Sequence, residues 1–529
     1  VTITVQGEAR PDGELPNEPF VASSRVKRER LAGPALRAQD VLRSELGVQI
    51  SESGALGAPA TASIRAASAA QTPVYLGGVR LNDQLGGAAD LSTVPVWLID
   101  HVDVYRGNAP LEADDLGIGG AIFFEPRQPR RLEAAAGSSV GSFGTRAGFG
   151  YVAGGNERLH LLGGVSAERA ENDYSFADDR GTLFQPGDDA RRQRSNADSR
   201  LFDAWLLGRA RPSQHVRLEL VANSVSREQG APRLALVPSD AARAEFSRSL
   251  GALTARFALG HTRRQRLTLR TTFLDSDQRL HDPELELGLL TSETRVQGRR
   301  SEQHASLSLP LTGTLEATGA ADVGFENLKR VDAAEQVSAS AATVRAAAKL
   351  EWQPLKGFAL RGLLASECRS LQQRQQTCAE LEPVGRVGLG LAGKGYTLYA
   401  NLARYQRQPT LGELYGAGIV VRGNAGLRRE LGLSADVGAR GSLALGPRLS
   451  VNGEIGAFER RARDLVAYAR TAQGYVVPLN VGAARVSGLE LGVGAAALGH
   501  LLLVAGVGQR REQTDHHQGD HHLHKREAT

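Results

Sequence analysis

The chain has 529 residues, of which 41% are hydrophobic, and it carries a formal net charge of +5. No apolar run approaches the roughly 18 to 20 residues that a transmembrane helix requires, which excludes a helical membrane protein. Nearly all the positive charge comes from arginines spread among acidic residues, and without a compact basic patch we expect no binding to nucleic acid. The length allows either a few ordinary domains or one large barrel with a small domain.

The first residues alternate apolar and polar side chains before a flexible stretch begins. Residues 1–5, Val-Thr-Ile-Thr-Val, form a short β-prone segment. The segment suits either a frayed terminal strand or a peptide that adds to a partner's sheet edge, because strand addition needs only a free backbone and alternating side chains. Further along, apolar residues on one face of 33–43 predict a helix with Pro34 in its first turn, and residues 47–50 begin a strand.

The stretch from residue 74 to residue 126 is too apolar for a linker and too often interrupted for a long helix. Residues 74–76 run into a Gly-Gly pair, residues 99–105 alternate apolar and polar side chains, and residues 118–122 lead into another strand. Glycine pairs mark turns or close backbone approach, because glycine adopts positive φ at little cost. The stretch predicts a compact, strand-rich unit, and the polar, proline-containing break at 126–131 predicts a domain boundary.

Four short motifs follow one another in and around this unit. They are Leu-x-Gly-Val-Arg-Leu-Asn-Asp from Leu76, Val94-Pro95, IDHVDVYRG from Ile99 to Gly107, and GIGGAI from Gly117 to Ile122. In order and spacing they resemble the plug domain of TonB-dependent outer-membrane receptors, and Ile64-Arg65 lies where that family usually has an Ile-Arg-Gly turn. Two positions depart from the family pattern. Gly77 stands where the family usually has Asp, and Ala66 stands where it usually has Gly.

From Leu132 onward the sequence changes to segments of about ten residues that alternate apolar and polar side chains. Examples are residues 216–223, 267–273, 344–352 and 449–457. A strand that spans a membrane needs about 9 to 11 residues, and a closed sheet leaves no unpaired edge in hydrocarbon. Roughly 17 or 18 such segments lie in the region that follows. The pattern favours an antiparallel transmembrane β-barrel over a soluble β-sandwich, which rarely sustains such alternation over this length.

The linkers between these segments alternate between short and long. Long polar linkers occupy residues 171–200, 227–245, 275–287 and 406–430. This asymmetry is typical of barrels with short periplasmic turns and longer extracellular loops. We therefore expect a ligand to meet the long polar loops first.

The chain has two cysteines, Cys368 and Cys378, which lie between two strand-like runs. In an exported chain, a disulfide that closes this loop is the leading interpretation, and two free thiols are the alternative. No histidine lies nearby in the sequence, so we do not expect the two cysteines to bind a metal ion.

Two further motifs lie in the C-terminal part of the chain. One is RYQRQPTLGELYG from Arg404, followed by Gly423-Asn424 and LRRE ending at Glu430, and the other is NVGAARVSGLE ending at Glu490. Both are similar to barrel signatures of the same receptor family, so the resemblance covers the plug and most of the barrel. It implies an all-β transmembrane antiparallel barrel with a small α+β plug domain in its lumen. The expected divisions are a tether at 1–12, the plug at 13–131, the barrel at 132–512 and a His-rich tail at 513–529.

The resemblance also implies roles for individual residues. The TonB-binding segment, or Ton box, would consist of Thr2, Ile3, Thr4 and Val5. The family pairs plug arginines with barrel glutamates, and the matching residues here are Arg65, Arg106, Glu430 and Glu490. A buried Arg–carboxylate pair is strong only while both charges are present, so such a cluster could hold the plug until TonB pulls. The alternative is that these four side chains are ordinary solvated charges of the lumen.

The C-terminal tail is unusual for this family, whose barrels end on an amphipathic strand with a terminal aromatic residue. Residues 501–508 resemble a strand, but the strands counted up to this point are well short of the usual 22. We therefore expect about four or five strands to be missing, through a shifted reading frame or in a natural fragment. The tail carries five histidines, which bind Zn²⁺ or Ni²⁺ weakly wherever they cluster and are weak metal candidates. They are His516, His517, His521, His522 and His524.

The sequence offers no catalytic motif, since it lacks a Gly-x-Ser-x-Gly elbow, a His-Glu-x-x-His helix and a phosphate loop. We expect no enzyme and no cofactor. The resemblance implies a receptor in the outer membrane of a Gram-negative bacterium, exported with its signal peptide removed. It would take up a scarce nutrient, first a ferric siderophore and next cobalamin. Its partners would be TonB, outer-membrane lipid and an extracellular ligand such as a metal chelate. The alternative is a truncated or non-transporting homologue that acts as a surface-binding or structural component.

Overall fold

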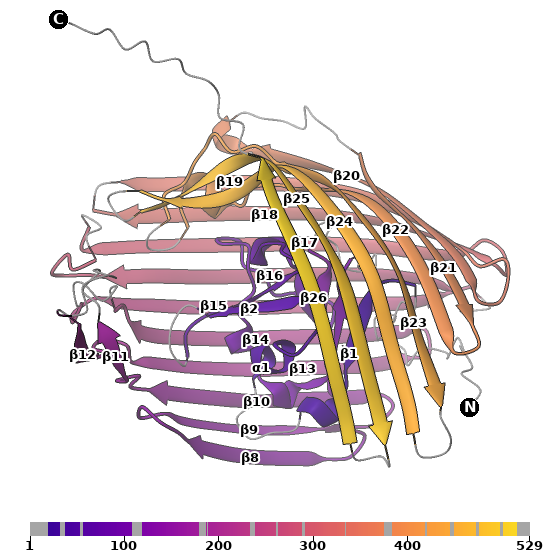
Figure 1. The fold of residues 1–529 in the computed structure, drawn as a ribbon, viewed down its shortest axis with the longest axis horizontal. Coiled ribbons are helices and arrows are strands. Elements are labelled where there is room, and N and C mark those ends of the chain that lie inside the picture. Colours follow the sequence, from indigo (N-terminus) through magenta and orange to yellow (C-terminus); the bar gives the residue numbers. More distant parts are fainter. Residues whose placement is uncertain are drawn as a thin grey trace, which may run out of the picture.

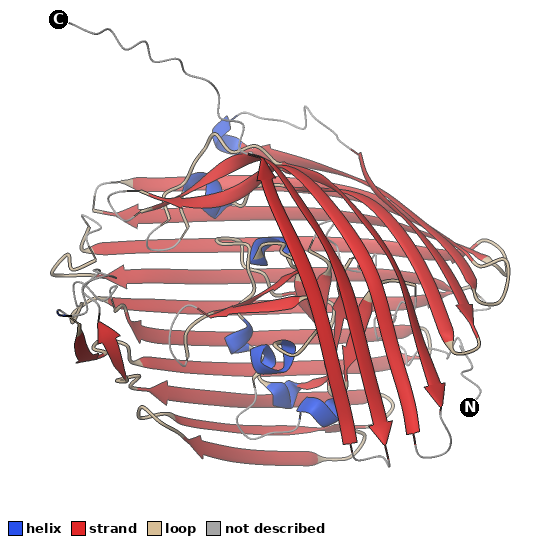
Figure 2. Cartoon of the chain, viewed as in Figure 1, coloured by secondary structure: helices blue, strands red, loops and turns tan. Residues whose placement is uncertain are grey.

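The computed structural model describes residues 20–31, 37–52, 57–107, 119–178, 187, 189–232, 239–260, 263–287, 291–333, 335–374, 383–417, 421–444, 449–471, 475–497 and 501–515. A small N-terminal domain lies within a large antiparallel sheet that curves around it (Figure 1). Most of the short helices lie in this inner domain (Figure 2). Within the described ranges, no helix has the length and apolarity needed to cross a membrane.

The inner domain, which we call the plug, combines two small sheets with short helices. Its five-stranded sheet has the order β1 (Ser23–Val26), β6 (Ile99–Tyr105), β7 (Ala121–Pro126), β4 (Val74–Leu76) and β5 (Val79–Arg80). A hairpin of β2 (Val48–Glu52) and β3 (Ala60–Ile64) lies beside it. The helices are α1 (Ala38–Leu42) and the 3-10 segments η1 (Arg28–Leu31), η2 (Ala69–Gln71), η3 (Leu91–Thr93) and η4 (Val96–Leu98). The helix predicted at 33–43 is therefore present at its C-terminal end, while residues 32–36 lie outside the described ranges.

The plug strands β4 and β7 are buried along almost their whole length, which explains their nearly continuous apolar sequences. Tyr75 on β4 stacks on Phe123 on β7 at 4.8 Å between ring centroids, and Tyr105 on β6 meets Phe123 edge-on at 5.4 Å. Gly120 has φ = +75°, and a Cβ there would lie 1.9 Å from the carbonyl oxygen of Tyr105. The Gly-Gly pair before β7 is thus required by close backbone approach.

The outer sheet is a series of 17 strands in which neighbours in space are neighbours in the chain, apart from a small excursion between β10 and β13. The strands are β8 (Glu133–Val140), β9 (Arg146–Gly155), β10 (Leu159–Ala170), β13 (Ser199–Ser213), β14 (Val216–Gly230), β15 (Arg243–Leu259), β16 (Gln265–His281), β17 (Glu293–Pro310), β18 (Leu315–Asp332), β19 (Gln336–Trp352), β20 (Phe358–Leu371), β21 (Pro383–Gly393), β22 (Tyr396–Arg407), β23 (Glu430–Ala444), β24 (Leu449–Arg470), β25 (Val476–Ala497) and β26 (Leu501–Asp515). The excursion is the hairpin of β11 (Ser175–Asp178) and β12 (Ala190–Gln193).

Antiparallel pairing is continuous from β8 to β26, and the strand order places β26 next to β8. Because neighbouring strands are antiparallel and the series has an odd number of strands, β8 and β26 run in the same direction. In Figure 1, strands β22 to β26 run steeply across the view, whereas β8 to β18 lie nearly horizontal. The described series is shorter than the 22 strands of the large outer-membrane transporters.

Side chains alternate between the two faces of the outer sheet, as the sequence predicts for a membrane barrel. On β16, Leu269 and Phe273 are 41% and 48% exposed on the outer face. Thr272, which precedes Phe273 and lies on the opposite face of the strand, is buried. An apolar outer face suits lipid, and the polar inner face meets the plug. The long linkers contain two further short helices, η7 (Gln372–Arg374) and α2 (Leu411–Tyr415).

Candidate functional site: the interface between plug and barrel

Arg65 lies just after β3 and reaches across to the barrel strand β25. Its Nε donates to Glu490 Oε1 at 2.8 Å and its Nη2 donates to Glu490 Oε2 at 2.6 Å. The two side chains are only 2% and 4% exposed, so the pair is bidentate and almost completely removed from water. The guanidinium also lies 4.5 Å from the centre of the Phe458 ring on β24. This pair joins two of the four residues that the resemblance assigns to a plug–barrel cluster.

The turn that presents Arg65 has an uncommon backbone. Arg65 and Ala66 have φ values of +48° and +64°, in the left-handed region that non-glycine residues seldom occupy. Ala66 stands where the family usually has glycine. Its positive φ explains that preference, because glycine adopts this region at little cost. The turn holds the Arg65 side chain toward β25 at the cost of local strain.

Arg106 follows β6 and reaches the same region of the wall. Its Nη2 donates to Glu454 Oε1 on β24 at 2.5 Å, and its Nη1 lies 3.7 Å from Glu490 Oε2. Burial lowers the pKa of Arg106, but Glu454 and Glu490 outweigh that effect and raise it, so the guanidinium stays charged. Tyr399 Oη also donates to Glu454 Oε1, at 3.3 Å. The nearer partner of Arg106 is therefore Glu454, which sequence reasoning did not select.

Arg460 on β24 contributes a third buried guanidinium, and it binds the plug backbone instead of a carboxylate. Its Nη1 donates to the carbonyl oxygens of Ile64 and Arg65, both at 3.0 Å, and its Nη2 donates to the carbonyl oxygen of Arg106 at 3.1 Å. One barrel side chain thus caps the ends of β3 and β6 together. In sequence it is one arginine among many, and only its place on the inward face of an alternating strand could have marked it.

Glu430, the fourth predicted residue, lies at the start of β23 and does not contact Arg65 or Arg106. It accepts a hydrogen bond from Gln71 Nε2 of the plug at 2.6 Å and one from the backbone N–H of Val466 at 2.8 Å. Arg407, its cross-strand partner on β22, donates to both of its oxygens, at 2.8 and 2.9 Å. The charge of Glu430 is compensated within the barrel, and its link to the plug is an amide.

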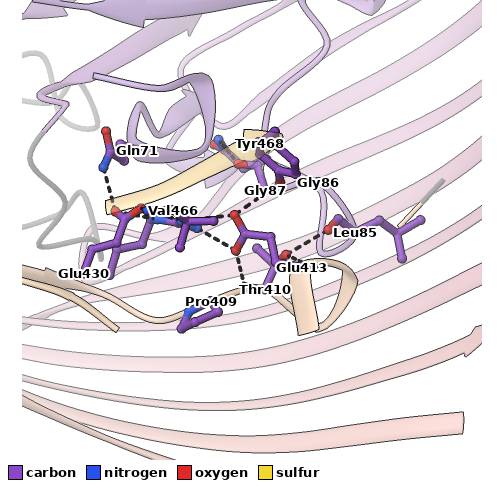
Figure 3. A network of polar contacts seen from close by, with 12 residues as sticks. Gln71, Leu85, Gly86, Gly87, Pro409, Thr410, Glu413, Glu430, Val466 and Tyr468 are labelled. Atoms are coloured by element: carbon purple, nitrogen blue, oxygen red, sulfur yellow. Dashed lines mark hydrogen bonds and ion pairs between the residues drawn. The ribbon is translucent and has the colours of Figure 1, made fainter. Parts of the chain in front are cut away.

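The loop after β22 folds inward beside Glu430 and touches the tip of the plug (Figure 3). Thr410 and Glu413 form a reciprocal capping box at the start of α2, and Thr410 Oγ1 donates to the carbonyl oxygen of Leu85 in the plug at 2.9 Å. Glu413 also pairs with Arg407 at 3.0 Å and accepts from Tyr468 Oη at 3.3 Å. Arg407 therefore bridges two carboxylates and fixes the inward loop to the wall.

Arg227 on β14 holds another part of the plug. In the strand order, β14 lies well away from strands β22 to β25, which make the contacts described above. Its Nη2 lies 2.6 Å from Asp90 Oδ2. Asp90 is the N-cap of η3 and also accepts hydrogen bonds from the backbone N–H groups of Ala60 and Ser92, both at 3.1 Å. Burial would raise the pKa of Asp90, but Arg227 and these hydrogen bonds outweigh it and hold the pKa below its usual range.

Several predicted residues fall outside the described ranges. These are Thr2, Ile3, Thr4 and Val5 of the Ton box, Cys378, and the tail histidines His516, His517, His521, His522 and His524. Cys368 lies on β20 and is disulfide-bonded, while its pairing with Cys378 stays a prediction. Among the residues that the structure describes, no group of three or more His, Cys, Asp or Glu side chains could hold a metal ion.

Two family models match the chain on either side of the domain boundary. The TonB-dependent receptor plug domain matches residues 18–121, and the TonB-dependent receptor-like β-barrel matches residues 381–519. The chain belongs to the TonB-dependent receptor family. This family consists of receptors and transporters of the Gram-negative outer membrane, and not of enzymes.

Relatives of this receptor differ in what their names say they carry. An 86-residue segment, 16% of the chain, is 33% identical to "Vitamin B12 transporter BtuB" of Vibrio vulnificus (strain YJ016) but spans only 14% of that protein. The copper transporter OprC has a TM-score of 0.73 at 15% identity, over 93% of this chain and 81% of that one. The siderophore receptor PirA from Acinetobacter baumannii has a TM-score of 0.72 at 13% identity, over 94% and 81%. At these identities the structures establish the fold alone.

Proposed function

We propose that this receptor imports a scarce nutrient across the outer membrane by TonB-coupled transport, with a ferric siderophore as the first candidate cargo and cobalamin as the second. The observation that carries the proposal is the buried cluster in which Arg65 and Arg106 of the plug meet Glu490 and Glu454 of the barrel. Separating a buried ion pair is costly, because it leaves each charge without its partner in a site removed from water. Such a contact suits a plug that must stay closed at rest and move under force.

The path by which a pull would reach the cluster is short. The first described strand, β1, pairs with β6 from Ser23 opposite Tyr105 to Val26 opposite Val102. The backbone N–H of Arg106 donates to the carbonyl oxygen of Ala22 at 2.8 Å. A force applied to the chain before Phe20, where the proposed Ton box lies, would therefore load the β1–β6 ladder and then Arg106.

The candidate cargoes are drawn from the names of the relatives. The match to a vitamin B12 transporter supports cobalamin, and the fold is shared with proteins named for siderophores, for copper and for heme with its hemophore. These names define the panel to be tested. The long polar loops and the inward loop around α2 are the surfaces that such a cargo would meet first.

The test is nutrient-limited growth of a host that lacks its own receptors and expresses this chain. We expect growth on at least one ferric siderophore or on cobalamin, and no growth when TonB is absent or when Ile3 is replaced by Pro, which blocks strand addition. Replacing Glu8 by Ala in the same tether is the matched control and should leave growth intact. Cargo binding without uptake, in cells with TonB, would instead favour the non-transporting surface-binding homologue.

A further inference from the structure

Three arginines form a row across neighbouring strands on the outer face of the barrel. Strands β9, β10 and β13 lie side by side (Figure 1), and in their register Arg169 on β10 is directly opposite both Arg146 on β9 and Arg200 on β13. Arg169 is four residues from Val165 and Arg200 is two residues from Phe202, and both of these apolar side chains are exposed on the outer face. Because side chains alternate along a strand, all three arginines point outward, and all three are exposed.

The arginine row lies at the end of the barrel that carries the long linkers. The strands β9 and β10 are joined by the short turn 156–158 at their other end, whereas the linker 171–198 begins just after the row. Short turns are periplasmic and long loops extracellular in such barrels. Arg146 is nine residues from Gly155 at the other end of β9, which at about 3.4 Å per residue and the usual tilt gives a height of about 22 to 25 Å, close to that of the apolar band. The row therefore lies where the hydrocarbon of the extracellular leaflet meets its headgroups.

The positive charge of the row is compensated at one end only. Within β8, β9, β10 and β13, the three arginines are the only charged residues on the outer face. Glu228 on β14 lies opposite Arg200, but the two side chains are 4.0 Å apart and Glu228 lies closer to Arg243, at 3.2 Å. Among the described residues, neither Arg146 nor Arg169 has an ion-pair partner. Like charges directly opposite one another are destabilising, so the row favours a bound anion.

The carboxylates that lie near the row in sequence are engaged elsewhere. Glu168 belongs to the inner face, where it pairs with Arg37 of the plug. Glu171 lies beyond the end of β10, and its backbone N–H donates to the β8–β9 turn. Elsewhere on the outer face, Arg299 on β17 has its own carboxylate partner, Asp275 on β16, at 2.8 Å. The excess of positive charge is thus a property of the β9–β13 surface and not of the whole barrel.

An apolar groove of about 840 Å³ runs along the outer face toward the hydrocarbon from this row. Its floor includes Gly150, and exposed Val152 and Leu206 rise beside it. A second hollow of about 600 Å³ is lined by the three arginines together with Gly148 and Phe202. Gly148 and Gly150 are successive outward residues of β9, so the two hollows follow one another along the same strands. The surface therefore joins a cationic end to an apolar furrow.

We propose that this surface binds a phosphorylated lipid of the extracellular leaflet, with its phosphate on Arg146, Arg169 and Arg200 and an acyl chain in the groove. Guanidinium groups make strong charge-assisted hydrogen bonds to phosphate oxygens. Such a lipid supplies both the anion that the row favours and the apolar chain that the groove accommodates, whereas free phosphate would leave the groove unfilled. The inference goes beyond nutrient transport and does not depend on it.

The test is native mass spectrometry of the full-length protein in detergent, titrated with diphosphoryl lipid A and, separately, with dioleoylphosphatidylcholine. Both probes carry acyl chains and phosphate, but the headgroup of phosphatidylcholine has no net charge. Because each arginine near an anionic headgroup contributes to affinity, we expect the wild type to bind diphosphoryl lipid A about tenfold or more tightly than phosphatidylcholine.

Two variants separate the headgroup site from the groove. Arg169→Gln, at the centre of the row, should weaken binding of diphosphoryl lipid A about fivefold, and Arg146→Gln/Arg169→Gln should weaken it further. Gly150→Leu should weaken binding of both lipids by filling the groove, and the strand tolerates it because a Cβ there meets nothing closer than 4.0 Å. The matched control is Arg299→Gln, an outward arginine whose side chain is 68% exposed and paired with Asp275, and it should bind as the wild type does.

Heat-modifiability on a gel shows that each variant is folded. Equal affinity of the wild type for the two lipids, or wild-type affinity in Arg146→Gln/Arg169→Gln, would overturn the headgroup site. Unchanged affinity in Gly150→Leu would overturn the groove as the place of the acyl chain. Because the titration needs neither TonB nor cargo, its result is independent of the growth test of transport.

Discussion

Arg65 of the plug and Glu490 of β25 form a bidentate ion pair across the domain interface, with both donor–acceptor distances below 3 Å and both side chains buried. The residues are 425 positions apart in the chain. Their contact therefore exists only when the plug is seated, which makes it a direct report of the closed state.

Replacing Arg65 by Ala should loosen the plug, because the Glu490 charge would stay buried without its partner. Removal of one partner of a buried pair costs about 3–5 kcal/mol. Amide hydrogen exchange of β3 and β6 in the detergent-solubilised protein should accelerate accordingly. The control is Arg43→Ala, which removes an exposed plug pair with Glu52 and should change little. Equal exchange in the two variants would contradict a locking role for Arg65.

Charge reversal tests the specificity of the same pair. We expect Arg65→Glu and Glu490→Arg each to open the plug, and the double variant to recover part of the protection. Arg65 is the better partner for this exchange than Arg106, since Arg106 lies 3.7 Å from Glu490 and closer to Glu454. A double variant as unprotected as the worse single variant would show that the pair has no energetic coupling.

Arg460→Lys should weaken the plug even though the positive charge is kept. The ammonium group of lysine cannot reproduce the planar fork that donates to three backbone carbonyls, at the ends of β3 and β6. Hydrogen exchange should rise at both strand ends together. Arg461→Lys, the neighbouring and 66% exposed arginine, serves as control. Unchanged protection in Arg460→Lys would mean that charge alone matters at this position.

Glu430→Gln should disturb the inward loop more than Glu413→Gln does. A glutamine at 413 can keep the capping box with Thr410, because its amide oxygen still accepts the backbone N–H. Both substitutions remove a charge that Arg407 contacts twice. A glutamine at 430 must also turn its amide N–H2 toward Gln71 or toward the backbone N–H of Val466, both of which are donors, whereas at 413 the N–H2 can face the Tyr468 hydroxyl, which can accept. Thermal unfolding midpoints should fall further for Glu430→Gln, and the reverse order would refute this ranking.

The Asp90–Arg227 contact predicts an acid-sensitive component of stability. The folded pKa of Asp90 is depressed, so its contribution is complete above the unfolded value of about 3.9 and is lost as the pH falls through the lower folded pKa. Unfolding midpoints measured from pH 7 to pH 3 should therefore decline at the acid end. In Asp90→Asn that part of the decline should be absent. An identical acid profile in both proteins would rule out this assignment.

Much of this protein could be predicted from sequence, because its strongest signals are local. Alternation of side chains has a period of two, so Leu269 and Phe273 could be assigned to one face of a strand without knowing any neighbour. The plug motifs fixed the place of Arg65 and Arg106, and the later signatures fixed Glu430 and Glu490. The inward α2 loop also follows a local rule, since Thr410 and Glu413 have the spacing of a capping box.

Tertiary structure alone decided which of these charges meet. Glu430 pairs with Arg407 because the β22–β23 register places them opposite each other, and this leaves only an amide, Gln71, to link it to the plug. Arg106 donates to Glu454, and Arg460 donates to plug carbonyls. Both contacts depend on how the plug is docked in the barrel. The sequence by itself therefore determined the two domains and, in the segments with clear alternation, the face on which each side chain lies. The partners across the interface required the structure, since register and docking join segments hundreds of residues apart, which no local pattern encodes.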